Sequence, residues 1–371
     1  MTSSASHVAV DEQPGNRPQL LSIRDVTKAY PAGGMGGPRG MELLAVDNVS
    51  LDIGPGETLG LVGESGCGKT TLARVILQLI DITHGSVSFA GRELTTLSRR
   101  EMNGVRRDLQ VVLQDPYASL NPRMRIHDIV AEPLVTHDRS YRGRGGAPTR
   151  RQKVSDLLSS VGLDPAVQDR YPHEFSGGQR QRIGIARALA LDPRLVVCDE
   201  AVSALDVSVQ AQILQLLQRL QRERGLSYLF VSHDLSVMRQ IADRIAVMYL
   251  GRIVEVAETE RLFTHPRHPY TQALLSAAPI ADPAKSGSAR RVVLQGDPPS
   301  PVNPPSGCHF RTRCPLSRSD CALERPPLDE AGPSGHVAAC LFPVETTEEL
   351  IAAQAAREKG AASSVTPQDA S

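Results

Sequence analysis

The chain has 371 residues, of which 40% are apolar, and this is enough for one large domain with an appendage or for two domains. Its 41 basic residues balance 41 acidic ones and only 4% are aromatic, which disfavours proteins that wrap nucleic acid or stack on bases. The sequence lacks an apolar run of the roughly 20 residues that span a membrane, and segment 1–17 lacks the apolar stretch of a secretory signal, so we expect a cytosolic protein with reduced thiols.

Residues 1–19 are polar and predict a disordered tail, and residues 31–40 form a Gly-rich insert. The spacing of apolar residues in the rest of this part of the chain predicts strands and helices. The predicted elements are strands 20–26, 43–53 and 58–62, helix 70–80, hairpin 87–93, strand 109–113, helix 182–189, strand 195–198, helix 207–220, strand 228–231 and hairpin 245–256. Short buried strands that alternate with helices are typical of an α/β fold with a mainly parallel sheet.

A glycine-rich loop joins strand 58–62 to the predicted helix that follows it. It fits the pattern G-x-x-x-x-G-K-S/T with Gly63, Glu64, Ser65, Gly66, Cys67, Gly68, Lys69, Thr70 and Thr71. Glycine lets the backbone N–H groups face a phosphate chain at the start of a helix. Lys69 can reach the β- and γ-phosphates, and the Thr70 hydroxyl suits Mg²⁺, which prefers hard oxygen ligands. The loop therefore predicts a site for a phosphate chain with its metal ion.

A second signal lies where strand 195–198 ends in Asp199 and Glu200. The first carboxylate can lie near the metal and act on it through a water molecule, and the second can orient and deprotonate an attacking water. An Asp-Glu pair after a strand is often only a solvated strand end. Together with the glycine-rich loop, however, it predicts hydrolysis with Glu200 as the base.

Further polar groups follow predicted strands or open predicted helices. Gln114 follows strand 109–113 and His233 follows strand 228–231. A hydroxyl and bare backbone N–H groups at a helix start offer a second anion site. Ser176, Gly177 and Gly178 would form that site, and Gln179 follows them. A further run after Glu200 consists of Ser203, Ala204, Leu205 and Asp206. Each has an ordinary explanation, such as a turn or a helix cap, but their order and spacing agree jointly.

In this order and spacing, residues 20–275 resemble the ATP-binding subunits of ABC transporters. The resemblance implies a P-loop NTPase of the α/β class, with a mixed, mainly parallel sheet core and an antiparallel β subdomain. It also implies a helical subdomain at about 115–190. ATP and Mg²⁺ are the implied ligands.

The resemblance assigns a role to each motif. Residues 63–71 would bind ATP and Tyr30 would stack on adenine, while residues 176–179 would be the signature that completes the ATP site of a partner subunit and residues 203–206 the D-loop. The implied catalytic residues are Glu200, His233 and Gln114, and the implied Mg²⁺ ligands are Thr70, Gln114 and Asp199. Ala201 stands where these proteins usually have Pro, which could loosen the turn that aims Glu200.

Three longer stretches, 114–123, 171–182 and 265–270, look like the dipeptide/oligopeptide importer ATPases. Those act at the cytoplasmic face of the inner membrane with a second, non-identical ATPase, two membrane permeases and a substrate-binding protein. The resemblance thus implies a head-to-tail ATPase dimer and no nucleic acid partner. Related importers carry nickel or glutathione, so the cargo stays open. A non-transport ABC ATPase is disfavoured because the chain has one copy of each motif and no heptads.

After Pro279 the composition changes to Pro, Gly and Ser, and four Cys follow in a segment with little apolar content. A segment that cannot bury a core needs a staple, and in the cytosol four Cys favour a metal site over disulfides. Region 276–345 resembles the C-terminal extension of the peptide-importer ATPases, some of which carry a 4Fe–4S cluster. We expect this cluster at Cys308, Cys314, Cys321 and Cys340, with zinc or metal-free thiols as alternatives. Cys67 and Cys198 should be core thiols, and 346–371 a weakly ordered tail.

Overall fold

The computed structural model describes residues 19–32, 42–115, 117–277, 294, 296–333 and 335–363, with the backbone alone at 347 and 357–363. The predicted tail at 1–19 and insert at 31–40 therefore lie almost entirely outside the described residues. None of the helices in the described ranges is long and apolar enough to cross a membrane.

An eight-stranded sheet forms the centre of the molecule, with the strand order β11-β12-β10-β9-β3-β8-β7-β6. Five neighbouring strands, β9, β3, β8, β7 and the edge strand β6, are parallel, whereas β10, β12 and β11 continue the sheet in antiparallel pairs. The strands are β3 (Thr58–Val62), β6 (Leu109–Val112), β7 (Leu195–Asp199), β8 (Ser227–Ser232), β9 (Arg244–Tyr249), β10 (Arg252–Glu258), β11 (Asp329–Glu330) and β12 (Val337–Ala338). The predicted mixed, mainly parallel sheet is confirmed.

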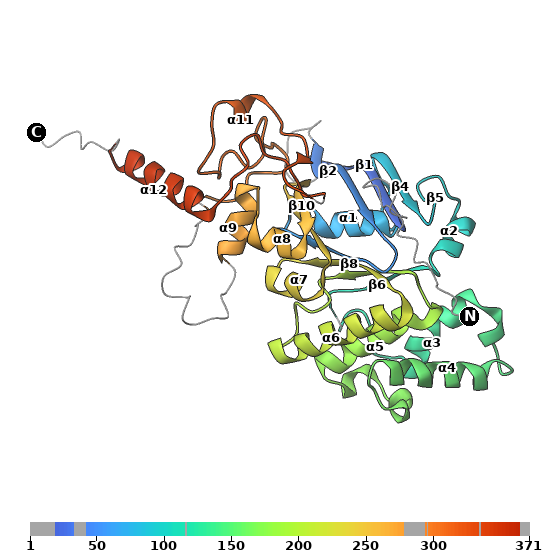
Figure 1. The fold of residues 1–371 in the computed structure, drawn as a ribbon. Coiled ribbons are helices and arrows are strands. Elements are labelled where there is room, and N and C mark those ends of the chain that lie inside the picture. Colours follow the sequence, from blue (N-terminus) through green and yellow to red (C-terminus); the bar gives the residue numbers. More distant parts are fainter. Residues whose placement is uncertain are drawn as a thin grey trace, which may run out of the picture.

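Alternate side chains of the inner strands belong to two different cores, because successive residues of a strand point to opposite faces. In β7, Val196 and Cys198 face one core, while Leu195 and Val197 face the other. Burial on both faces explains why these strands are continuous apolar runs in the sequence. Figure 1 shows the layers on the two sides of these strands.

One layer combines α1 (Lys69–Ile76) with a small antiparallel sheet of order β2-β1-β4-β5, and α2 (Arg99–Val105) packs with them. Its strands are β1 (Leu21–Pro31), β2 (Glu42–Ile53), β4 (His84–Phe89) and β5 (Arg92–Glu93). The other layer is helical and contains α3 (Ile126–His137), α4 (Ala147–Ser160), α5 (Gly177–Ala188), α6 (Val207–Arg224) and α7 (Leu235–Ile241). Short 3-10 turns link α3, α4 and α5 at Arg139–Tyr141, Pro165–Asp169 and Pro172–Glu174, and another follows at Leu189–Leu191.

The C-terminal region, residues 294–363, packs against the ATPase-like part of the chain. It follows α8 (Thr259–Thr264) and α9 (Pro269–Ala277) and contains α11 (Asp320–Leu323), β11, β12 and α12 (Thr347–Ser363). Its Phe310 is 1% exposed and lies 5.3 Å from the ring of Tyr249 and 5.4 Å from that of Tyr270. The sequence predicts a weakly ordered tail here, but α12 is anchored by Leu350, which is fully buried beside Ala273.

Candidate active site

The predicted catalytic groups meet at one edge of the central sheet. The glycine-rich loop at residues 63–71, called the phosphate loop from here on, follows β3. Gln114 follows β6, Glu200 follows β7 and His233 follows β8. These four strands are parallel neighbours, so their carboxyl ends lie at the same edge, where open α/β sheets bind ligands. Sequence spacing alone could not show that they converge, because the residues are up to 170 positions apart.

The phosphate loop, residues 63–71, has the tight backbone that its glycines allow. Gly68 has a φ of +111°, and a Cβ there would lie 2.1 Å from the carbonyl oxygen of Ala45, so only glycine fits. Lys69 begins α1 and is 5% exposed. Its ammonium group donates to the carbonyl oxygens of Gly63 at 2.8 Å and Glu64 at 2.9 Å. The loop thus presents a helix N-terminus and a buried cation, which fit a phosphate chain.

Hard oxygen atoms lie beside the loop. The Thr70 hydroxyl donates to Asp199 Oδ1 at 3.3 Å. Burial raises the pKa of Asp199, the hydrogen bond from Thr70 lowers it, and the nearby Glu200 charge raises it further. A hydroxyl and a buried carboxylate so close together fit Mg²⁺, which would add its own charge to stabilise the ionised Asp199 and neutralise bound phosphates.

Glu200 is held from both sides. Gln114 Nε2 donates to its Oε2 at 2.6 Å, and His233 Nδ1 lies 3.3 Å from its Oε1. Its backbone has a φ of +48°, which is uncommon for a residue other than glycine and often marks a functional turn. The turn is fixed by the N–H of Glu200, which donates to Val231, and by Ser203, whose N–H and hydroxyl donate to the Glu200 carbonyl. Ala201 is buried within the same turn.

Residues 176–179, the predicted signature, open α5 on the other face of the sheet from α1 (Figure 1). Ser176 and Gln179 bond to each other's backbone N–H groups and form a capping box. A Cβ at Gly178 would lie 2.4 Å from Val209 of α6, so close helix packing already requires glycine there. Asp206 occupies the cap position of α6 without a side-chain cap bond.

Tyr30 is the last residue but one of β1 in the small sheet. It is 37% exposed, and the Lys28 ammonium lies 4.9 Å from the centre of its ring. The exposed ring can stack on a flat ligand, as the resemblance implies.

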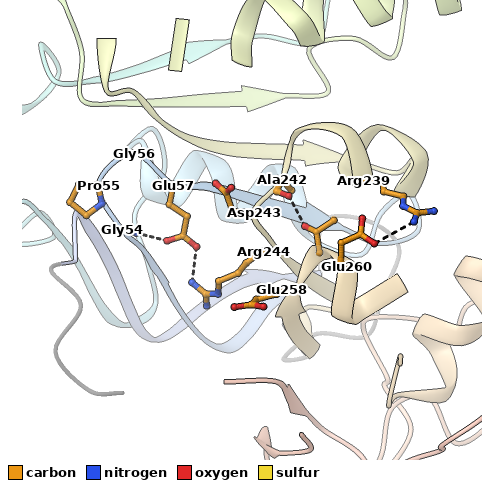
Figure 2. Close-up of a pocket in the computed structure, with 11 residues that line it drawn as sticks. Gly54, Pro55, Gly56, Glu57, Arg239, Ala242, Asp243, Arg244, Glu258 and Glu260 are labelled. Atoms are coloured by element: carbon orange, nitrogen blue, oxygen red, sulfur yellow. Dashed lines mark hydrogen bonds and ion pairs between the residues drawn. The ribbon is translucent and has the colours of Figure 1, made fainter. Parts of the chain in front are cut away.

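A cavity of about 740 Å³ lies at the opposite edge of the sheet, near the start of β3 and β9. Figure 2 shows its walls, where Glu57 pairs with Arg244 at 2.8 Å and Glu260 with Arg239 at 3.4 Å. None of the predicted nucleotide residues lines this cavity. Its volume alone therefore gives no reason to move the candidate site away from the phosphate loop.

Two residues that contact the loop carry no motif that identifies them as part of the site. The Tyr270 hydroxyl accepts a hydrogen bond from the Glu64 N–H at 3.0 Å, and Arg313 forms two hydrogen bonds with the Glu64 carboxylate. They lie 206 and 249 residues from Glu64, so no local pattern could have indicated the contacts.

The predicted iron–sulfur cluster is wrong. No disulfide joins Cys308, Cys314, Cys321 and Cys340, which line one small, largely apolar cavity. No group of three or more His, Cys, Asp or Glu in the described ranges could hold a metal ion, which also removes the zinc alternative. Burial raises the pKa of Cys314 and Cys340 to about 12, so these thiols stay protonated at neutral pH. The region is instead held by an apolar core around Phe310. Cys67 and Cys198 are buried thiols, as predicted.

Comparison with known proteins agrees with this site. A family model described as "ABC transporter" matches residues 46–203, and one described as "Oligopeptide/dipeptide transporter, C-terminal region" matches residues 254–321. The sequence is 50% identical over 332 residues to the putative oligopeptide transport ATP-binding protein YkfD of Bacillus subtilis. This match covers 90% of this chain and 98% of YkfD. It is 53% identical over 299 residues to the oligopeptide transport ATP-binding protein OppF of Escherichia coli, with 81% and 88% covered.

Among solved structures, the dimeric post-hydrolysis state of the ATP-binding cassette MJ0796 bound to ADP and Pi has a TM-score of 0.57 at 31% identity. The match covers 64% of this chain and 98% of that chain. The predicted P-loop fold and ATP hydrolase activity are therefore confirmed at the level of the family. The chain is an ABC-type ATPase and belongs to the family of oligopeptide transport ATP-binding proteins.

Proposed function

We propose that this chain is the ATP-binding subunit of an importer that takes up oligopeptides or dipeptides. The observation that carries the proposal is the combination of two parts in one chain. The first is the phosphate loop with the Asp199 and Glu200 carboxylates, and the second is a C-terminal region that matches the oligopeptide/dipeptide transporter family. The names of YkfD and OppF both describe oligopeptide transport, whereas neither mentions nickel or glutathione.

Each group at the sheet edge has a distinct task in the proposed hydrolysis. Residues 63–71 bind the phosphate chain of ATP, and Thr70, Asp199 and Gln114 hold Mg²⁺, which supplies charge neutralisation when bound. Glu200 accepts the proton of the attacking water. His233 and Gln114 orient its carboxylate, because each already contacts one of its two oxygens.

The signature acts in a second subunit. The phosphate loop precedes α1 in one layer, and Ser176 precedes α5 in the other, so one chain does not bring both to one ATP. A head-to-tail dimer with a homologous ATPase supplies residues 176–179 and the adjoining residues 203–206 to the partner's nucleotide. The solved dimer of a related cassette supports this arrangement.

The other partners are two membrane permeases and a substrate-binding protein that acts through them. The layer of α3, α4 and α5 is the part that engages the permeases, and the ATPase is peripheral at the cytoplasmic face of the membrane. Opening and closing of the ATPase dimer then drives alternating access. The Cys-containing C-terminal region belongs to the same subunit.

The Glu200→Gln variant tests the proposal, because it keeps the shape of the side chain and removes the base. We expect ATP to bind and to trap a stable dimer, seen by light scattering, while ATP turnover falls at least a hundredfold. Glu223→Gln, on the exposed end of α6, is the matched control and should keep normal turnover. Turnover by Glu200→Gln at the wild-type rate would contradict the role of Glu200.

Cargo is tested with the complete transporter in lipid vesicles. ATP hydrolysis should rise when the substrate-binding protein carries a short peptide. Stimulation by a nickel- or glutathione-loaded binding protein, with none by peptide, would overturn peptide import.

A further inference from the structure

A partly buried ion pair joins the C-terminal region to the phosphate loop. Arg313 Nη1 donates to Glu64 Oε2 at 2.7 Å, and Nη2 donates to Oε1 at 2.9 Å. The Arg313 side chain is only 6% exposed, and its guanidinium also lies 5.9 Å from the ring of Tyr249. Two parallel hydrogen bonds to one carboxylate fix both the position and the orientation of that carboxylate.

The remaining polar groups of Glu64 are also engaged. Its N–H donates to the Tyr270 hydroxyl at 3.0 Å, and its carbonyl accepts from the Lys69 ammonium at 2.9 Å. Tyr270 in turn packs against Phe310, three residues before Arg313. The conformation of this loop residue is therefore set largely by residues from the C-terminal part of the chain.

The charge of Glu64 makes the contact important for nucleotide binding. A free carboxylate in a loop that receives a polyanion would repel it, and the repulsion would be strong in a partly buried site. Burial alone would lower the pKa of Arg313, but its hydrogen bonds to Glu64 outweigh this and raise the pKa, so Arg313 stays charged. The pair thus removes a negative charge from the loop.

We propose that Arg313 is a positioning residue for the phosphate loop, which neutralises and orients Glu64 so that ATP binding depends on the C-terminal region. The inference rests on ATP binding at this loop. Because Arg313 contacts the phosphate loop, loss of the Arg313 side chain should raise KM for ATP in the assembled transporter. Because Glu200 is held by Gln114 and His233, the same loss should leave kcat within twofold of wild type.

The test is ATP titration of the full chain with a charge-removing variant. Arg313→Gln should raise the Kd for ATP at least tenfold, and added salt should reduce this defect because it screens the unpaired carboxylate. The double variant Arg313→Gln with Glu64→Gln should bind ATP at least threefold more tightly than Arg313→Gln alone. Arg311→Gln is the matched control, because Arg311 donates to Ser306 within the C-terminal region, and its Kd should stay within twofold of wild type.

The outcomes separate this inference from the proposed function. If the wild-type chain does not bind ATP, the proposed function fails. If it binds ATP and Arg313→Gln binds equally well, only the role of Arg313 fails. A raised Kd of Arg313→Gln, together with a lowered melting temperature and no recovery of ATP affinity in the double variant, would also overturn that role, since this result would indicate misfolding.

A second variant decides the matter if Arg313→Gln does not fold. Arg313→Lys keeps the charge but not the two-pronged geometry. A Kd raised two- to fivefold at an unchanged melting temperature supports the positioning role, and an unchanged Kd overturns it.

Discussion

Phe310→Ala should destabilise the protein strongly, because Phe310 links the C-terminal region to the central sheet. Its ring is 1% exposed and lies 5.3 to 5.7 Å from the rings of Tyr249, Tyr270 and His268. A buried Phe→Ala change costs about 3–5 kcal/mol. Aromatic pairs contribute about 0.5–1.5 kcal/mol each beyond burial. We therefore expect a loss of about 4–5 kcal/mol in the free energy of unfolding, in the upper half of the range for a buried Phe→Ala change.

Urea denaturation followed by circular dichroism measures this loss, and thermal melting should show a decrease of roughly 6 °C for a chain of this size. Phe310→Leu keeps most of the apolar volume and should cost only about 1–1.5 kcal/mol. The matched control is Leu323→Ala in α11, where the side chain is 84% exposed, and its effect should stay within about 0.5 kcal/mol. A Phe310→Ala protein within about 1 kcal/mol of wild type would refute the apolar core as the support of this region.

Three further changes test other parts of the structure. Gly178→Ala should cost about 1–3 kcal/mol because its Cβ would meet Val209, whereas Gly184→Ala in the same helix, with open space around it, should gain about 1 kcal/mol, both measured by urea denaturation. Lys69→Ala should abolish ATP binding in an equilibrium titration without lowering the melting temperature by more than a few degrees, since Lys69 donates to groups of its own loop, the Gly63 and Glu64 carbonyls and the Cys67 sulfur. Burial lowers the pKa of His268 to about 4, from about 6.5 in the unfolded chain. As the pH falls below 6.5, the unfolded chain therefore protonates this histidine before the folded protein does, and the free energy of unfolding should decrease by about 3 kcal/mol by pH 4. The pH dependence of the melting temperature should become flatter in His268→Asn, whose amide oxygen can replace Nδ1 as an acceptor without titrating.

The nucleotide site could be predicted from the sequence because its signals are local. Strand 58–62 has the predicted bounds, strand 195–198 is one residue longer in the structure, and strand 228–231 is longer by one residue at each end. The prediction succeeds because continuous apolar runs bounded by turns are typical of strands that are buried on both faces. The loop glycines and the Asp199-Glu200 pair are contiguous with those strands. The structure adds contacts that depend on the fold, such as the bonds from Gln114 and His233 to Glu200.

The residue types at 176–179, the predicted signature, are compatible with two different roles. The sequence predicts an anion site at Ser176, Gly177 and Gly178, and the structure uses the Ser176 and Gln179 side chains in a capping box at the same helix start. A capping box and an anion site require the same residue types, because both satisfy the free N–H groups of a helix terminus. The packing of Gly178 on Val209 depends on how α5 and α6 cross, which no short pattern encodes.

The C-terminal region shows why composition misled the metal prediction. A Pro- and Gly-rich segment was expected to need a staple because it has too few apolar residues for a core of its own. The segment does not build its own core, because Phe310 enters one whose other rings, Tyr249 and Tyr270, come from β9 and α9. β12 likewise pairs with β10 and extends the central sheet. Since the stability of this region comes from surfaces of the ATPase, its folding and the position of Arg313 at the phosphate loop depend on the same contacts.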